Sequence, residues 1–248
     1  MADKIRRKIK ILFAASEAVP FVKTGGLADV AGSLPKALKA AGAKVAVIIP
    51  KYGTIPEEYT SKMQHIAEFY VPLAWRSVYC GIDKLTYDGV DFYFVDNEAY
   101  FKRDSLYGYF DDGERYAFFS KAICEAIQWI PELQCDILHC NDWHTALIPA
   151  FLNTWYRSNE KFANIRTVFT VHNLKFQGVY DVKTIQGLSG LPDYYFSPDK
   201  LEAYKDAYML KGGLVFADVI TTVSETYAEE IKTPFYGEGL DELLSARS

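Results

Sequence analysis

The segment from Lys23 to Gly26, with the sequence KTGG, has the composition of an anion-binding loop. Lys23 brings a full positive charge, and the two consecutive glycines let a ligand approach the backbone closely. A predicted helix follows directly, and the first N–H groups of a helix have no partner within it, so they favour a negative charge. The segment therefore predicts a phosphate site, while a plain glycine turn beside a solvated lysine explains the same residues.

Polar residues also follow several predicted strands, at the point where each strand ends. In doubly wound sheets, ligands bind just beyond the carboxyl ends of the strands, so these residues should gather around one site. They are Ser16 and Glu17, the run from His139 to His144, His172 with Asn173, and Ser224 with Glu225.

Each of these residues has a structural alternative. His139, Asp142 and His144 could hold a metal, but such a cluster suits a hydroxyl-rich ligand equally well, and we expect no metal or cofactor here. Trp143 could stack on a sugar ring, although its type favours a core anchor. His172 follows the apolar run TVFTV and is either a structural histidine or a site residue.

Other catalytic arrangements find little support. Residues 100–116 are rich in tyrosine, glycine and charge, which is typical of a carbohydrate-stacking loop or of an irregular surface loop. The acidic candidates Glu17, Asp29 and Asp142 do not form the carboxylate pair of a glycosidase. Ser224 lacks the GxSxG context of a hydrolase.

An alternation of short apolar runs and helical segments must position these residues. We expect strands at residues 9–16, 45–49, 137–140, 167–171 and 219–223, and helices at 27–41, 114–129, 145–156, 202–216 and from 226. Residues 67–97 suggest an antiparallel excursion with a hairpin, and residues 180–198 a long binding loop. The pattern predicts an α/β fold around a mostly parallel sheet.

Composition limits the possible partners and compartments. The 248 residues contain 27 Lys+Arg against 32 Asp+Glu, a net charge of -5 without basic clusters, which argues against nucleic acid and anionic membranes. The cysteines Cys80, Cys124, Cys135 and Cys140 form no CxxC pair and indicate free thiols. The apolar stretch near the amino terminus is too short for a signal peptide, and no segment is long enough to span a bilayer. We therefore expect a cytoplasmic protein.

Four motifs carry a resemblance to a known family. KTGGLADVAGSLPKAL at Lys23–Leu38, HCNDWHTALIPAFL at His139–Leu152, FTVHNLKFQG at Phe169–Gly178 and ADVITTVSETYAEEI at Ala217–Ile231 resemble bacterial glycogen synthases and plant starch synthases, glycosyltransferase family 5. Their order and spacing agree along the whole chain. The resemblance implies a glycosyltransferase B fold with two Rossmann-like halves, of which residues 1–248 look like the N-terminal, acceptor-side half. The C-terminal half, with most of the nucleotide-sugar pocket, is not in this sequence.

The resemblance also implies roles for individual residues. The catalytic residues it suggests are His172, Asp142 and Lys23, with the backbone at His172 stabilising the transition state. Lys23 would reach the sugar nucleotide, and the amides of Gly25 and Gly26 would lie against its phosphates. Asp29, Tyr107, Asp142 and His144 would lie along the glucan acceptor or the transferred glucose.

The implied reaction is a retaining transfer of glucose from ADP-glucose to the non-reducing 4-hydroxyl of an α-1,4-glucan. Fixed positive groups would neutralise the leaving diphosphate without a metal. This chain alone would be inactive without its second domain. A non-catalytic glucan-binding module remains an alternative. A nicotinamide-dependent oxidoreductase is disfavoured, because no GxGxxG follows the first predicted strand.

Overall fold

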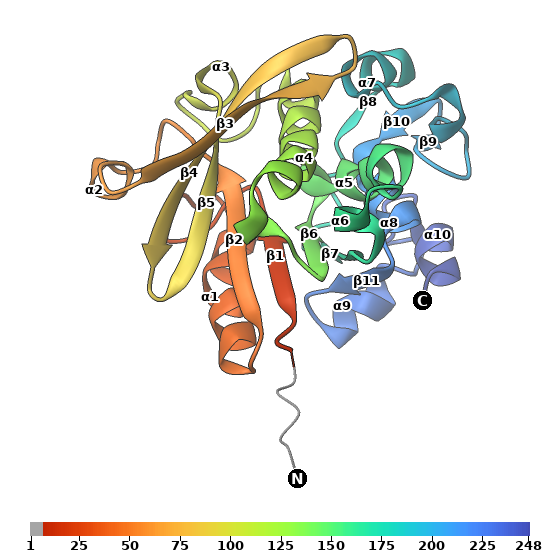
Figure 1. Cartoon of the computed structure of the whole chain (residues 1–248). Coiled ribbons are helices and arrows are strands. Elements are labelled where there is room, and N and C mark those ends of the chain that lie inside the picture. The colour runs from red at the N-terminus through yellow and green to blue at the C-terminus, as the bar shows by residue number, and fades with distance from the viewer. Residues whose placement is uncertain (1–6) are drawn as a thin grey trace.

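An eight-stranded sheet runs through the centre of the computed structural model, which describes residues 7–248 (Figure 1). Its strand order is β11-β7-β6-β1-β2-β5-β4-β3. The strands are β1 (Lys10–Ala14), β2 (Lys44–Pro50), β3 (Gln64–Leu73), β4 (Arg76–Tyr87), β5 (Val90–Asp96), β6 (Ile137–Asn141), β7 (Arg166–Val171) and β11 (Val219–Thr222).

Strand β1 lies at the point where the order of the parallel strands reverses. It pairs in parallel with β2 on one side and with β6 on the other, and Ala14 is in register with Ile48 and with Cys140. These three residues are fully buried, as expected for a parallel sheet covered on both faces. Such a reversal opens a crevice beyond the carboxyl ends of the strands, which is where ligands bind in this class of fold.

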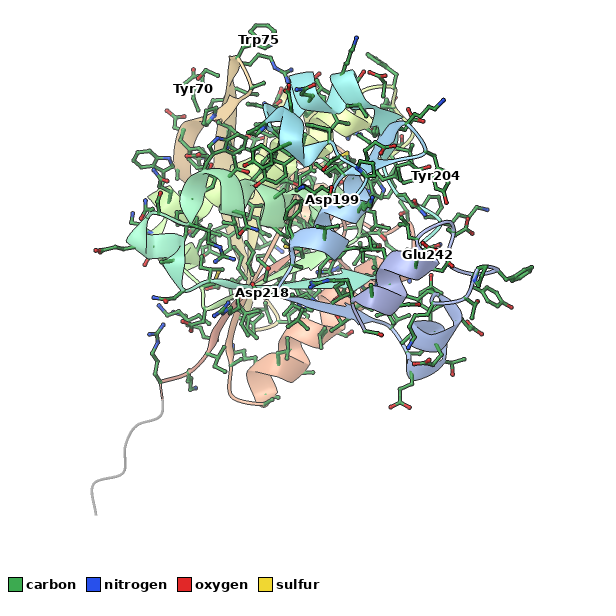
Figure 2. All side chains as sticks on the ribbon, turned by 90° about the vertical axis from the view of Figure 1, so that its right-hand side faces the viewer. Tyr70, Trp75, Asp199, Tyr204, Asp218 and Glu242 are labelled. Atoms are coloured by element: carbon green, nitrogen blue, oxygen red, sulfur yellow. The ribbon has the colours of Figure 1, made fainter. Side chains whose placement is uncertain are left out.

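The expected antiparallel excursion is confirmed. Strand β4 pairs antiparallel with both β3 and β5, while β5 pairs in parallel with β2. Asp88 and Gly89 join β4 to β5 with positive φ angles of 48° and 74°, the geometry of a type I′ hairpin turn. At the β3–β4 hairpin, Trp75 is 87% exposed, and Figure 2 shows it at the edge of the molecule near Tyr70.

Helices cover the sheet and connect its strands. α1 (Gly26–Ala40) packs against β2, and α4 (Asp112–Trp129) is buried along most of its length. The other helices are α2 (Glu57–Thr60), α3 (Glu98–Phe101), α5 (Leu147–Phe151), α6 (Glu160–Ala163), α7 (Val182–Ser189), α8 (Met209–Phe216), α9 (Glu225–Glu230) and α10 (Asp241–Ala246). Short turns of other helix types are η1 (Pro131–Leu133), η2 (Trp143–Thr145), η3 (Leu152–Tyr156) and η4 (Asp193–Tyr195).

The helix expected at residues 202–216 is wrong in its first half. Its place is taken by β9 (Glu202–Ala203) and β10 (Asp206–Tyr208), and helix α8 begins only at Met209. With β8 (Val179–Asp181), these strands form a small antiparallel sheet in the order β8-β10-β9. Pairing with β8, distant in sequence, overrides the local helical pattern.

Two further expectations are corrected. The binding loop expected at residues 180–198 contains helix α7, whose first turn is capped by the Asp181 side chain and which ends at Gly190 with a φ of 74°. The single helix expected at residues 145–156 is divided into α5 and the π-helical turn η3.

The remaining structural expectations concern thiols and membranes. All four cysteines are free, as expected. Among residues 7–248, no helix combines the length and apolar character needed to cross a bilayer.

Candidate active site

A cavity of about 860 Å³ opens at the carboxyl ends of β1, β6, β7 and β11. Most of the predicted site residues line it, namely Gly25, Gly26, Tyr107, Asp142, His144 and His172. Lys23 and Asp29 are not part of its lining. The strand ends therefore converge on one site, as the sequence predicts.

Asp142 joins two of these strand ends. It directly follows β6, its N–H donates to the carbonyl of Thr170 over 3.0 Å, and its carboxylate accepts the N–H of His172 over 2.7 Å. Burial raises the pKa of Asp142 to about 7, and the backbone N–H groups of His172 and Asn173 oppose this by stabilising the charged form. The carboxyl group is thus able to exchange a proton near neutral pH.

His172 is held as a neutral imidazole. Its Nε2 lies 2.9 Å from the side-chain oxygen of Asn141, whose amide nitrogen donates to the carbonyl of Ala14 over 3.0 Å. Because an amide oxygen only accepts, Nε2 carries the proton and Nδ1 keeps its lone pair. Burial lowers the pKa of His172 to about 4. The ring therefore adds no positive charge at neutral pH.

His144 lies among aromatic rings. Its centroid is 4.7 Å from that of Tyr107, 4.6 Å from Tyr116 and 4.3 Å from Trp143. Burial lowers its pKa to about 3, and its Nδ1 has no hydrogen-bond partner within residues 7–248. An unpaired buried polar atom is unusual in a folded protein. Trp143 both packs in the core and lines the cavity, so its two interpretations are compatible.

Glu17 holds the KTGG loop in place, and the sequence analysis did not recognise this role. Its carboxylate accepts the N–H and the hydroxyl of Thr24 over 2.6 and 2.7 Å, and the N–H of Gly25 over 3.2 Å. The predicted phosphate-facing amide of Gly25 thus has a partner inside the chain. Glu17 immediately follows the polar end of the first predicted strand, and that position was the available signal.

Lys23 forms an ion pair with Asp29 at the edge of the site. Its ammonium nitrogen lies 2.7 Å from both carboxylate oxygens, and both side chains are about half exposed. The lysine predicted to meet the sugar nucleotide is therefore paired with the aspartate predicted to lie near the acceptor.

The sequence analysis missed the cavity residue Asp112 and its partner Arg115. Asp112 lines the cavity and accepts the N–H groups of Gly108 and Tyr109 over 2.8 and 3.2 Å. The fully buried Arg115 pairs with Asp112 and donates to the carbonyl of Leu106 over 3.1 Å. These bonds hold the tyrosine-rich loop on α4. The spacing of Asp112 and Arg115 at the start of a predicted helix was the only signal.

Tyr107 is positioned by this anchored loop. Its hydroxyl lies 2.7 Å from the Ser16 hydroxyl, just beyond β1. The predicted acceptor-side tyrosine thus belongs to the cavity wall, and its segment is not a loose surface loop.

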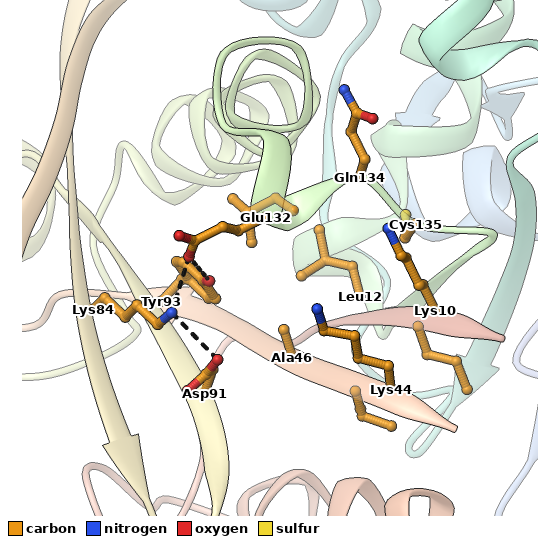
Figure 3. A pocket seen from close by; sticks show the side chains of 13 residues that line it. Lys10, Leu12, Lys44, Ala46, Lys84, Asp91, Tyr93, Glu132, Gln134 and Cys135 are labelled. Atoms are coloured by element: carbon orange, nitrogen blue, oxygen red, sulfur yellow. Dashed lines mark hydrogen bonds and ion pairs between the residues drawn. The ribbon is translucent and has the colours of Figure 1, made fainter. Parts of the chain in front are cut away.

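A second hollow, of about 240 Å³, lies at the amino ends of the central strands β1 and β2 (Figure 3). Lys10 and Lys44 line it at the start of β1 and β2, and Lys84 pairs there with Glu132 over 2.9 Å and with Asp91 over 3.3 Å. It contains no predicted site residue.

Within residues 7–248, no group of three or more His, Cys, Asp or Glu side chains is arranged to hold a metal ion.

A mostly parallel sheet with a cavity at its strand-order reversal defines a ligand-binding domain of the doubly wound class. The chain belongs to the starch synthase catalytic domain family, whose model matches residues 10–246.

Relatives found by sequence include bacterial glycogen synthases. The chain is 55% identical to that of Clostridium novyi over 240 residues, covering 97% of this chain and 50% of that protein. It is 56% identical to that of Desulforamulus reducens over 236 residues, covering 95% and 49%. The chain therefore spans about half the length of the curated relatives it matches.

A similar solved structure is the catalytic domain of starch synthase IV from Arabidopsis thaliana, bound to ADP and acarbose. The TM-score is 0.88 at 28% identity, and the match covers 97% of this chain and 50% of that chain. The expected fold, one half of a glycosyltransferase B arrangement, is confirmed together with the family.

Proposed function

We propose that this chain is the acceptor-side half of a retaining glucosyltransferase that moves glucose from ADP-glucose to the 4-hydroxyl of an α-1,4-glucan. The observation that carries the proposal is the bond between the Asp142 carboxylate and the His172 N–H, at the centre of a cavity lined by most of the predicted residues. The Arabidopsis enzyme of the same fold, bound to ADP and acarbose, supports a nucleotide and an oligosaccharide as ligands.

In this proposal, the cavity binds the transferred glucose and the acceptor end. The Asp142 carboxylate, the neutral His144 ring and the backbone at His172 offer polar groups to sugar hydroxyls and to the oxocarbenium-like transition state. Tyr107 would line the side of the cavity that receives the acceptor. Because these groups are fixed by hydrogen bonds and packing, they need little rearrangement when charge develops.

Lys23 would assist departure of the diphosphate. The approaching diphosphate would compete with Asp29 for the Lys23 ammonium, and the free first N–H groups of α1, from Gly26 onward, would add positive potential. These groups would neutralise the leaving group without a metal ion or cofactor. Asp29, once released from Lys23, would face the acceptor.

A second half of the enzyme would complete the cleft. The chain matches about half of each relative, and we infer that the other half supplies the base pocket and that residues 1–248 alone do not transfer glucose. The partners would be ADP-glucose and glucan in the cytoplasm, without nucleic acid or membrane. A glucan-binding module without catalysis is the second candidate, supported by the acarbose bound to the Arabidopsis enzyme.

The test is transfer of labelled glucose from ADP-glucose to glycogen. The 248-residue chain is compared with a chimera that joins it to the remaining half of the Clostridium novyi glycogen synthase. We expect transfer by the chimera only. Transfer by the chain alone would show that the domain assignment is wrong, and glycogen binding by a folded chimera without transfer would favour the binding module.

A further inference from the structure

Lys121 is a buried lysine in the middle of α4, away from the candidate active site. Only 4% of the surface of Lys121 is exposed to solvent. Its ammonium nitrogen lies 3.5 Å from the ring centroid of Trp155, 4.7 Å from that of Tyr156 and 5.2 Å from that of Phe151. Three aromatic faces therefore surround the cation.

No hydrogen-bond acceptor in the described part of the chain meets this ammonium group. The nearest carboxylate on the helix, Glu125, accepts from the hydroxyl of Tyr156 and from the Trp129 indole over 3.2 Å. Lys211 offers a contrast, because this buried lysine donates to the carbonyls of Pro198 and Glu202. The Lys121 side chain is thus largely buried, and its amine has no hydrogen-bond partner among residues 7–248.

The amine lines a cavity of about 520 Å³ that shares no residue with the candidate active site. Its walls come from the β3–β4 hairpin, α4, η3 and the end of α7, and they include the 40%-exposed Trp155. Lys121 and Glu125 are the only charged residues in its lining among those described. This volume lies in the range of small-molecule pockets.

Burial favours the neutral, nucleophilic form of the amine, whereas the three ring faces stabilise the ammonium ion. Burial lowers the pKa of Lys121 to about 8, against a weaker opposing effect of Cys124 and Glu125. At pH 7 about 10% of such an amine is neutral, compared with less than about 0.1% of an ordinary lysine. Tyr156, whose pKa is raised by burial, keeps its hydroxyl proton and adds no charge.

We propose that Lys121 is an acylation site, and that its amine reacts with small acyl phosphates that enter this cavity. The Nζ lone pair attacks the acyl carbon, the bond from that carbon to the phosphate oxygen breaks, and phosphate leaves with the electron pair. The attacking nitrogen loses one proton to solvent. The product is a neutral amide among the three rings, and no ion pair has to be broken to form it.

The test is a competition within the 248-residue chain. The chain is incubated with acetyl phosphate at pH 7.5, and peptide mass spectrometry follows acetylation of Lys121, of the exposed Lys183 on α7 and of the buried, hydrogen-bonded Lys211. We expect an initial rate at Lys121 at least about tenfold above that at Lys183, and a slower rate at Lys211. Acetyl-coenzyme A in a parallel reaction distinguishes an acyl phosphate from a bulkier thioester donor.

The pH dependence of the acetylation rate distinguishes an amine with a lowered pKa from one that reacts only because it is exposed. The rate at Lys121 should level off between about pH 8 and 9, whereas an ordinary lysine continues to gain reactivity past pH 10. The Lys121→Arg variant, which keeps the cation, assigns the modified peptide. A rate at Lys121 no higher than at Lys183, or a profile still rising at pH 10, would overturn the proposal.

Discussion

The carboxylate of Asp142 accepts the backbone N–H of His172 over 2.7 Å, so that one hydrogen bond joins the ends of β6 and β7 at the cavity. Asp142 makes this bond from an unusual backbone conformation, with φ at 56° and ψ at 179°. This region is essentially reserved for glycine and costs other residues about 1–3 kcal/mol. Backbone strain of this kind is commonly found at functional sites.

Replacing Asp142 by glycine and by alanine should separate the strain from the loss of the carboxylate. Both variants lose the bond to His172, but only glycine relieves the backbone. We expect Asp142→Gly to be more stable than Asp142→Ala by about 1 kcal/mol or more, although glycine normally destabilises relative to alanine. Urea unfolding measures the difference. Equal stabilities, or a more stable alanine variant, would show that Asp142 is not strained.

The raised pKa of Asp142 predicts a pH-dependent stability. An unfolded aspartate has a pKa of about 3.9, whereas the folded value is about 7. Between these values the folded chain holds a proton that the unfolded chain has lost, so the contribution of Asp142 to the free energy of unfolding falls as pH rises. The difference in free energy of unfolding between Asp142→Asn and the wild type should therefore shift by about 2–3 kcal/mol in favour of the variant between pH 5 and pH 8.

The comparison with the asparagine variant isolates this effect. Burial lowers the pKa values of His139 to about 4, His144 to about 3 and His172 to about 4, so these residues stabilise the fold above pH 6.5 and lose that contribution as pH falls. This opposite trend is common to both proteins and cancels in their difference. Parallel stability curves for the two proteins would contradict a raised pKa at Asp142.

Lys23 provides a test of the leaving-group hypothesis in the chimeric enzyme. Its pair with Asp29 is half exposed, and such pairs contribute about 0–1 kcal/mol, so Lys23→Ala should hardly change stability. Turnover should fall by about 100-fold or more if the ammonium helps the diphosphate to leave. Lys36→Ala is the matched control, because Lys36 is a half-exposed lysine on α1, the helix that carries Asp29, and it pairs with Asp88 away from the cavity. Equal turnover in the two variants would remove Lys23 from the mechanism.

The sequence predicted the parallel sheet and the location of the site because both depend on local patterns. Continuous apolar runs identify β1, β2, β6 and β7, and helix α1 follows from apolar residues at helical spacing. In a parallel sheet, the polar residues after these runs must meet at one edge. Asp142, His144 and His172 could therefore be placed together without knowledge of the tertiary structure.

What the sequence did not predict depends on distant partners. Ala207 pairs with Tyr180 in the small sheet, and Tyr204 and Lys205 turn the chain with positive φ angles of 52° and 74°, so the local helical pattern fails there. The positions of Glu17 and Arg115 in the sequence do not show which backbone groups these side chains bind. Their importance lies in bonds to backbone groups of neighbouring loops, and no residue pattern specifies which loop a charged side chain will hold.

Gly178 should be required for the position of Trp143. A Cβ atom at Gly178 would lie 2.8 Å from Cδ2 of the Trp143 ring, and its φ of 61° would strain any other residue. Gly178→Ala should therefore destabilise the chain by about 2–4 kcal/mol or displace the indole. Urea unfolding followed by tryptophan fluorescence detects both results.

Gly187→Ala is the matched control for this prediction. Gly187 lies inside helix α7, and a Cβ atom there would contact nothing within 4 Å, so alanine should stabilise by about 0.4–1 kcal/mol. Because the Trp143 ring lies 4.3 Å from that of His144, a displaced indole would also disturb the cavity and weaken glucan binding by the folded Gly178→Ala variant. Wild-type stability together with wild-type glucan affinity in that variant would refute the close contact between Gly178 and Trp143.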